Sequence, residues 1–371
     1  MKIGFIVHDY HRVGGHSRYV VELAERFSRD HDVHVYSNTC RVEAGSKVRF
    51  HHVPAVRSSA QATILSFLAS VALRRRSDFD VVHAQGLSSL RADVVTAHIC
   101  TQAWLRTQQR YGVGQLWKTR VFERLICPLE RRLYQSSESS VIAVSEKARR
   151  DLAECYGRRG RVKVIYHGVD GEHFRFKEGG ALRAEVRRSL GLGEDDIVLL
   201  YVGDLHKGAA FAIKALHLLP KGKLVFVTGT PTGLYRRMSR QLGDLGRVLF
   251  YPPTGDIRRF YAAADVFLFP TVYDAFGMVI SEAMAAGLPI ITTRQAGAAE
   301  LVSHGEDGLL LDDAADVGQM AEYLRELVED PILGRKLGRA AQETMRTHSW
   351  GRVAEQTMSV YEEAAARRRH E

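Results

Sequence analysis

The sequence predicts an α/β protein built from two Rossmann-like, doubly wound domains that face a central cleft. Short β-branched runs alternate with helical patterns, which is typical of parallel sheets covered by helices. The alternation stops near residues 167–180, a polar stretch rich in glycine, and then starts again. A length of 371 residues is enough for two domains of ordinary size.

The first half of the chain has six runs with strand character. We expect strands at residues 2–8, 32–37, 80–84, 92–98, 139–145 and 161–167. A helix is expected at residues 17–29, because apolar residues recur there at helical spacing. The first domain should therefore begin with a strand, a glycine-containing turn and a helix.

The second half repeats this pattern. Strands are expected at residues 196–204, 223–229, 247–252, 264–271 and 288–293, each followed by a helical pattern. A final helical pattern follows Trp350. In open α/β sheets of this kind, ligands bind beyond the carboxyl ends of the strands.

Composition indicates a globular protein, with 45% hydrophobic and 26% charged residues. The N-terminus has the pattern of a strand rather than of a signal peptide. The longest apolar stretch, residues 62–73, is shorter than the roughly 20 residues that span a bilayer. The cysteines form no C-x-x-C pair and are expected to be reduced thiols: Cys40, Cys100, Cys127 and Cys155. We expect a cytoplasmic location.

Positive charge is concentrated in part of the first domain. The chain carries a formal charge of +9, and residues 101–135 hold seven basic against two acidic residues. Arg74, Arg75 and Arg76 close the apolar stretch before it. Segments 62–76 and 101–135 therefore suit an anionic membrane surface, with a solvated, salt-bridged helix face as the alternative. No nucleic-acid motif is present, so nucleic acid is not an expected partner.

Two loops of the first domain could approach a ligand. Gly14 and Gly15 separate the first strand from its helix and let backbone come close to a bound molecule. His98 ends the strand 92–98 and is expected to face the ligand crevice, the alternative being a histidine bonded to backbone. The nearby histidines match no zinc spacing, so no metal site is expected: His8, His11 and His16. The D-x-D at residues 78–80 precedes its strand and is interpreted as a turn.

Two loops of the second domain carry candidate chemistry. Lys207, in the stretch VGDLHKG, lies at the start of a helix, where backbone N–H groups favour a phosphate; an exposed turn lysine is the alternative. Asp274 precedes the helix expected at residues 278–287, and Glu282 lies in its second turn. An anion would be favoured at this helix N-terminus, and Glu282 could accept hydrogen bonds from a diol such as ribose.

These motifs together resemble the retaining nucleotide-sugar glycosyltransferases of family 4, also called glycosyl transferases group 1, which have the GT-B fold. The resemblance covers most of the chain through five ordered motifs: GGHSRYVVELAERF, VSEKARRDLAECYG with VKVIYHGVDGEHF, VGDLHKG, YDAFGMVISEAMAAGLPII, and ELVSHGEDGLLL. It implies an acceptor domain at residues 1–167 and a donor domain at 168–349. The terminal helix, 350–371, would pack back on the first domain.

The resemblance also implies roles. The catalytic residues would be His98, Lys207 and Asp274. The donor-binding residues would be Gly14, Gly15, Lys207, Phe276, Gly277, Met278, Val279 and Glu282. The donor would be a nucleotide-diphosphate sugar, with a UDP-sugar favoured, and the acceptor a hydroxyl of a glycan, a glycolipid or a lipid-linked molecule. No metal or cofactor would be required, and similar enzymes dock on the inner face of the cytoplasmic membrane.

Three positions depart from the family pattern. His167 stands where asparagine is usual, and Asp274 stands where glutamate is usual. Asp204 stands where an arginine usually helps to neutralise the leaving diphosphate, in a loop shorter by two residues. Either Arg294 supplies the missing charge or Lys207 acts alone. A nucleotide-sugar 2-epimerase and a catalytically silent nucleotide-sugar-binding partner are the alternative functions.

Overall fold

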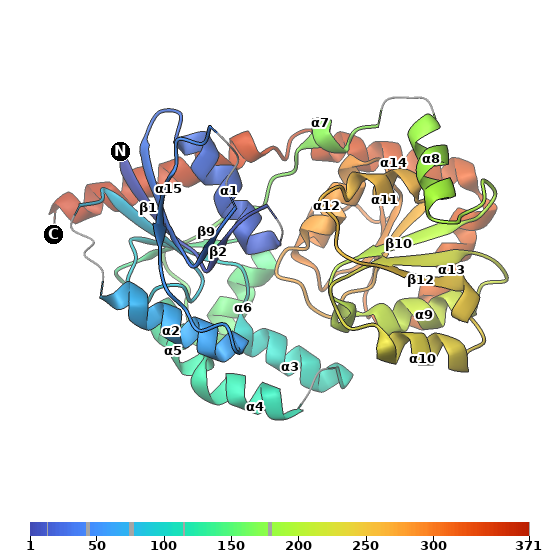
Figure 1. Ribbon diagram of the computed structural model, residues 1–371, viewed down its shortest axis with the longest axis horizontal. Coiled ribbons are helices and arrows are strands. Elements are labelled where there is room, and N and C mark those ends of the chain that lie inside the picture. The colour runs from blue at the N-terminus through green and yellow to red at the C-terminus, as the bar shows by residue number, and fades with distance from the viewer. Residues whose placement is uncertain (13, 42–44, 74–77, 114–115, 177–179, 371) are drawn as a thin grey trace. The chain divides into compact units, whose positions relative to one another are not determined.

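The computed structural model describes residues 1–12, 14–41, 45–73, 78–113, 116–176 and 180–370, apart from the side chains of residues 116–120 and 370. The chain divides into two compact units (Figure 1). Unit 1 contains residues 1–168 and 350–371, and unit 2 contains residues 169–349. Each unit has a parallel sheet of its own with helices packed against it.

Unit 1 contains a seven-stranded parallel sheet. Its strands lie in the order β5 (Arg49–His52), β3 (Asp32–Ser37), β1 (Lys2–Ile6), β6 (Val81–Gln85), β7 (Val94–Ala97), β8 (Ser140–Ala143) and β9 (Val162–Val164). Chain order runs outward from β1 on one side and from β6 on the other. The sheet is therefore doubly wound, and its topological switch point lies between β1 and β6. Two short strands, β2 (Asp9–Tyr10) and β4 (Thr39–Cys40), pair beside it.

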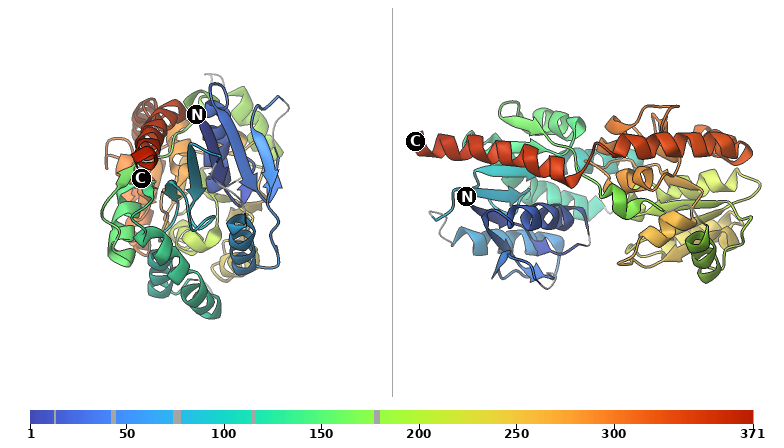
Figure 2. Two further views of the ribbon diagram at one scale, coloured as in Figure 1. Left: turned by 90° about the vertical axis from the view of Figure 1, so that its left-hand side faces the viewer. Right: turned by 90° about the horizontal axis from the view of Figure 1, so that it is seen from above.

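The helices of unit 1 include the last helix of the chain. They are α1 (Gly15–Phe27), α2 (Ala60–Ala72), α3 (Thr101–Tyr111), α4 (Leu116–Leu125), α5 (Cys127–Gln135), α6 (Glu146–Tyr156) and α15 (Trp350–His370). Helix α15 lies beside α1 (Figure 2). The Tyr361 hydroxyl lies 2.6 Å from Nδ1 of buried His83, and Arg368 donates to the Phe79 carbonyl at 2.8 Å. Trp350 is buried against Tyr19, so α15 completes the core of unit 1.

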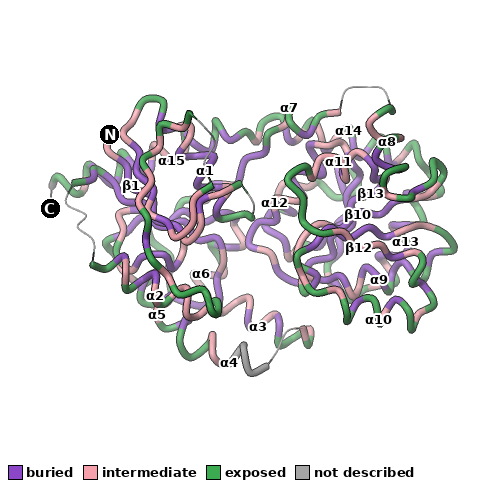
Figure 3. The backbone as a smooth tube through the Cα atoms, viewed as in Figure 1, coloured by how far each residue is buried: buried purple, intermediate pink, exposed green. Residues whose placement is uncertain are grey.

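Unit 2 contains a six-stranded parallel sheet. Its order is β12 (Val248–Tyr251), β11 (Lys223–Val227), β10 (Val198–Val202), β13 (Val266–Phe269), β14 (Ile290–Thr293) and β15 (Leu309–Leu311). Here the switch point lies between β10 and β13. Residues along β10 and β13 are largely buried (Figure 3), which explains why apolar runs predicted these strands.

The helices of unit 2 connect successive strands and close the unit. They are α7 (Gly171–Phe174), α8 (Ala181–Ser189), α9 (Ala209–His217), α10 (Gly233–Gln241), α11 (Arg258–Ala263), α12 (Met278–Ala285), α13 (Val317–Glu329) and α14 (Pro331–Met345). Short 3₁₀ turns lie at η1 (Leu205–Lys207), η2 (Leu245–Arg247) and η3 (Gly297–Leu301). No helix in the described part of the chain combines the length and the apolar character that a membrane crossing needs.

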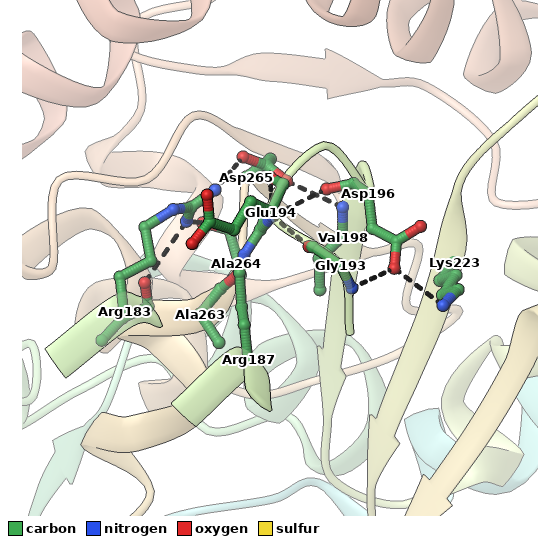
Figure 4. Close-up of polar contacts among 11 residues, drawn as sticks. Arg183, Arg187, Gly193, Glu194, Asp196, Val198, Lys223, Ala263, Ala264 and Asp265 are labelled. Carbon is green, nitrogen blue, oxygen red and sulfur yellow. Dashed lines mark hydrogen bonds and ion pairs between the residues drawn. The ribbon is translucent and has the colours of Figure 1, made fainter. Parts of the chain in front are cut away.

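A charge cluster around the buried Arg187 holds the amino end of the unit 2 sheet together (Figure 4). Arg187, from α8, is 2% exposed and lies 2.7 Å from the Asp265 carboxylate. Its guanidinium also donates to the backbone carbonyls of Ala263, Gly193, Glu194 and Asp196. Asp265 precedes β13 and accepts from the Val198 amide, at the start of β10, at 2.8 Å. The cluster therefore fixes helix α8 and the two central strands to one another.

Candidate active site

The carboxyl end of the unit 2 sheet brings Lys207 and Asp274 together. Lys207 lies in the turn η1 after β10, and Asp274 lies in the loop after β13. The Lys207 ammonium is 2.6 Å from Asp274 Oδ2, and the Val272 amide donates to the Lys207 carbonyl at 2.8 Å. The Lys207 side chain is 35% exposed and that of Asp274 is 15% exposed. The pair therefore joins the two loops at the switch point, where this class of sheet binds ligands.

Gly208 explains why the two loops can approach so closely. Its φ angle is 144°, a value that L side chains rarely adopt. A Cβ atom at this position would lie 1.9 Å from the carbonyl oxygen of Pro270. Only glycine fits there, so the Lys207–Gly208 pair combines a charged group with a close backbone contact.

Helix α12 begins directly after the Asp274 loop. Gly277 is its N-cap residue, with a φ angle of 90°, and no side chain caps the helix. The amide of Phe276 donates to Asp274 Oδ1 at 3.3 Å, so Asp274 also orders the loop before the helix. The first amides of an α-helix have no intrahelical acceptor, and they favour an anion. The amides of Met278 and Val279 thus begin a helix whose N-terminus is suited to a phosphate.

Glu282 lies in the second turn of α12 and is 6% exposed. The hydroxyl of Tyr261, from α11, donates to Glu282 Oε2 at 2.9 Å and to the Val279 carbonyl at 3.3 Å. A buried carboxylate needs hydrogen-bond donors. Tyr261 supplies one and fixes the orientation of the Glu282 carboxylate.

Asp204 caps the turn that carries Lys207. Its Oδ1 accepts from the His206 amide at 2.9 Å, from His206 Nδ1 at 2.7 Å and from the Thr230 hydroxyl at 3.0 Å. Burial opposes the charged form, but the hydrogen bonds from His206 and Thr230 lower the pKa of Asp204 to about 2. Asp204 is therefore an anion at neutral pH. Arg294, the candidate substitute for the missing arginine, pairs with Asp312 at 2.8 Å.

In unit 1, Gly14 and Gly15 form the start of α1 beside the β1/β6 switch point. Gly14 is the N-cap residue, with a φ angle of 92°, and Gly15 is the first residue of the helix. Both are exposed, and no side chain caps α1. Their backbone is therefore open to a ligand at the carboxyl end of the sheet.

His98 follows β7 and is buried among aromatic rings. Its Nε2 lies 2.8 Å from Oε1 of Gln85, the last residue of β6. Its ring stacks on His16 with centroids 4.4 Å apart, and the rings of Tyr19 and His167 lie 5.0 and 5.4 Å away. Burial, followed by the neighbouring histidines, lowers the pKa of His98 well below its ordinary value. His98 is therefore neutral, and its partner is a side chain rather than backbone.

Two family models match the chain. A model described as Glycosyl transferases group 1 matches residues 183–344, and one described as Glycosyltransferase Family 4 matches residues 13–173. The chain is a family 4 glycosyltransferase. The relatives and solved structures that resemble it differ in the share of their own length that this chain matches.

This glycosyltransferase is 29% identical to the D-inositol 3-phosphate glycosyltransferase of Streptomyces avermitilis, over 65% of this chain. The match spans 55% of that relative's length. The solved structure of WaaG, a glycosyltransferase involved in lipopolysaccharide biosynthesis, matches with a TM-score of 0.84 at 22% identity, covering 97% of this chain and 99% of that one. Anabaena Alr3699/HepE, solved with UDP-glucose, matches with a TM-score of 0.75 at 19% identity, covering 98% and 100%. The GT-B fold expected from the sequence is confirmed.

The structure places the predicted residues of this glycosyltransferase in two groups. Unit 2 brings together Lys207, Asp274, Phe276, Gly277, Met278, Val279 and Glu282. Unit 1 places Gly14, Gly15 and His98 at its own switch-point edge. Among the residues described, no cluster of three or more histidine, cysteine, aspartate or glutamate side chains could hold a metal ion.

Two partners of the predicted residues were missed. Gln85 ends β6 as a polar residue at a strand's carboxyl end, so the criterion that selected His98 also selects Gln85. Tyr261 lies in α11 among apolar residues and carries no comparable signal. Its contact with Glu282 joins two residues 21 positions apart and appears only in the folded unit.

Proposed function

We propose that this enzyme transfers a sugar, with retention, from a nucleotide-diphosphate sugar to a hydroxyl of a glycan, a glycolipid or a lipid-linked acceptor. The observation that carries the proposal is the Lys207–Asp274 pair beside the uncapped N-terminus of α12. A cation and helix amides at one strand edge suit a diphosphate. Family membership makes a nucleotide sugar the expected source of that diphosphate.

In the proposed reaction, Lys207 and the first amides of α12 stabilise the negative charge of the departing diphosphate. Such preorganised groups act most strongly where charge develops in the transition state. The acceptor hydroxyl attacks from the same face and gives its proton to the departing phosphate. Asp274 is not proposed as a nucleophile, because its two carboxylate oxygens already accept from Lys207 and from the Phe276 amide.

Glu282 is proposed to hold the ribose of the donor. Its carboxylate is buried in the second turn of α12, one turn beyond the proposed phosphate site. Tyr261 orients one oxygen, and a ribose diol would donate hydrogen bonds to the carboxylate. No step of this scheme requires a metal or a cofactor.

We favour a UDP-sugar as the donor, because the structurally similar HepE was solved with UDP-glucose. Thermal unfolding with UDP-, GDP-, ADP- and TDP-glucose tests the choice, since a ligand that binds only the native state raises the unfolding temperature. The largest shift is expected with the UDP-sugar. A shift with none of the four donors would contradict nucleotide-sugar binding. Retention is tested separately, by assigning the anomeric configuration of the product by NMR.

The acceptor is proposed to be reached from an anionic membrane surface, on the inner face of the cytoplasmic membrane. Helix α2 covers most of the apolar stretch and exposes Leu65, while Arg74–Arg76 lie outside the described residues. A cavity of about 680 Å³ lies along α5, and three arginines, Arg91, Arg131 and Arg132, line it together with Glu123 and Glu138. The excess of basic groups there suits anionic headgroups.

Co-sedimentation with phosphatidylglycerol vesicles tests this surface. Binding is expected at low salt and should weaken at high salt, because screening reduces attraction to the surface charge. Replacement of Arg131 and Arg132 by glutamine should weaken binding further. Equal recovery of the protein without vesicles and with anionic vesicles at low salt would contradict the membrane proposal but not the transfer reaction.

A further inference from the structure

His98 forms a buried hydrogen bond with Gln85, a residue to which the family resemblance gave no role. Gln85 and His98 end or follow neighbouring strands, β6 and β7, and both are buried, at 3% and 7% exposure. Gln85 Oε1 lies 2.8 Å from His98 Nε2. An amide oxygen can only accept, so the ring nitrogen donates. His98 therefore carries its proton on Nε2.

A neutral imidazole with its proton on Nε2 presents an acceptor on Nδ1. His98 Nδ1 is buried and has no hydrogen-bond partner among the described residues. The amide nitrogen of Gln85 is also buried without a partner in the described part of the chain. Buried polar groups are normally satisfied, and one that is not points to a missing ligand or water. A hydroxyl can donate to the bare acceptor on His98.

The ring is held in this orientation by its neighbours. His16 stacks on it, and Tyr19 meets it edge to face. The titratable groups that face His98 are His16 and Tyr19 from α1, His83 from β6, and His167 after β9. None of these is an acid that would favour an imidazolium. The His98 imidazole is therefore neutral when it bonds Gln85.

We infer that Gln85 is a positioning residue, which holds His98 as the neutral Nε2–H tautomer so that Nδ1 accepts a hydrogen bond from a hydroxyl of the transferred sugar. The inference rests on the proposed function. It makes His98 a hydrogen-bond acceptor that selects the sugar, rather than a general acid. A site built to bond a hydroxyl discriminates strongly against an analogue that lacks it.

The tautomer is measured directly in protein labelled with ¹⁵N-histidine, by two-bond ¹H–¹⁵N correlation spectra. The His98 signals are assigned by their loss in His98→Asn. The wild type is expected to show a protonated Nε2 and an unprotonated Nδ1. In Gln85→Leu a mixture of tautomers is expected. A protonated Nδ1 in the wild type would overturn the inference, and this readout does not depend on activity or on the stability of any Gln85 variant.

The pH profile gives a second readout. In Gln85→Glu a carboxylate replaces the amide and should raise the pKa of His98, because a nearby anion favours the imidazolium. The kcat/KM of Gln85→Glu should fall about tenfold as pH decreases from about 8 to about 6, because His98 becomes protonated in that range. In the wild type, protonation of His98 should cause no such fall. Gln342→Glu is the matched control, since Gln342 bonds the Ala285 carbonyl of unit 2 and lies outside both proposed binding surfaces. Identical profiles for both glutamate variants would contradict the inference.

Donor discrimination completes the test. The wild type should prefer its nucleotide sugar over one monodeoxy analogue by about a hundredfold, and Gln85→Leu should reduce this ratio about tenfold. An unchanged ratio for every deoxy position would contradict the assigned role. If the wild type and Gln342→Glu transfer no sugar from any donor, the proposed function fails, whereas the tautomer spectrum still decides the role of Gln85.

Discussion

Unit 2 places a cation–aspartate pair at each end of its sheet, and the two pairs differ in what surrounds them. At the amino end, Arg187 is 2% exposed and donates to four backbone carbonyls as well as to Asp265. At the carboxyl end, Lys207 is 35% exposed and bonds Asp274 across two loops. The cation of the first pair is enclosed by acceptors of its own chain, whereas the cation of the second remains partly accessible to a ligand.

The comparison separates stability from function. Burial of a charge is costly unless hydrogen bonds replace its hydration, which the carbonyls around Arg187 do. A pair whose cation is 35% exposed contributes less to stability, since solvent screens it. We therefore expect changes at the amino end to affect unfolding, and changes at the carboxyl end to affect catalysis.

The largest effect is expected from Arg187→Leu. Removing the guanidinium takes a donor from four backbone carbonyls, while Asp265 keeps its bonds from Arg183 and the Val198 amide. The free energy of unfolding should therefore fall by about 3–5 kcal/mol. Urea titration followed by circular dichroism measures the change. Arg183→Leu is the matched control, because Arg183 also bonds Asp265 but its side chain is 36% exposed. Equal losses in both variants would break the proposed distinction between buried and exposed charges.

Lys207→Ala should have the opposite signature. Loss of the cation is expected to lower kcat/KM for sugar transfer about 10²–10³-fold, because charge on the leaving diphosphate is no longer stabilised. The free energy of unfolding should change by less than about 1 kcal/mol. Lys214→Ala, on the exposed side of α9, is the control. Near-normal turnover of Lys207→Ala would contradict its assigned role.

Glu130 extends the comparison to unit 1. It is 2% exposed and accepts from the Thr101 amide and the Tyr156 hydroxyl, yet burial raises the pKa of Glu130 to about 7. A raised folded-state pKa contributes stability that is present below the unfolded value, about 4.5, and is lost as pH rises through about 7. Glu130→Gln should therefore gain about 2 kcal/mol relative to the wild type on going from pH 5 to pH 8. Parallel stability curves for the two proteins would contradict the shift.

The smallest effect is expected from Glu282→Gln. The substitution keeps the size of the side chain but weakens its acceptors, so the Kd for the nucleotide sugar should rise about tenfold, or about 1.4 kcal/mol. Tyr261→Phe, which removes the group that orients Glu282, should weaken binding by less. Calorimetric titration measures both. A Glu282→Gln variant that binds like the wild type would remove Glu282 from the proposed ribose site.

The positions of the central strands along the chain could be predicted from sequence, because buried parallel strands appear as apolar, β-branched runs. Two strands of the seven- and six-stranded sheets lacked that signal. β5 has the sequence RFHH and lies at the edge of its sheet, and β15 has only three residues, Leu309–Leu311. Edge strands and very short strands need little apolar sequence of their own, since their neighbours supply the pairing.

The candidate site likewise contains features that the sequence could predict and features that it could not. Lys207, Asp274 and His98 follow strands, so the position of each at a carboxyl edge could be predicted. Their side-chain partners could not, because Gln85–His98 and Tyr261–Glu282 depend on the packing of separate elements. Arg187 is one of several arginines in α8, and nothing in the sequence distinguishes it as the buried one. The functional roles of the predicted residues stay predictions.

The central claim is that the carboxyl end of the unit 2 sheet binds the diphosphate of a nucleotide sugar. Calorimetric titration of UDP-glucose into the wild type, Lys207→Ala and Lys214→Ala tests it most directly. We expect binding to the wild type and to Lys214→Ala with equal Kd values, and binding to Lys207→Ala at least about tenfold weaker. Equal Kd values for the wild type and Lys207→Ala would contradict the claim.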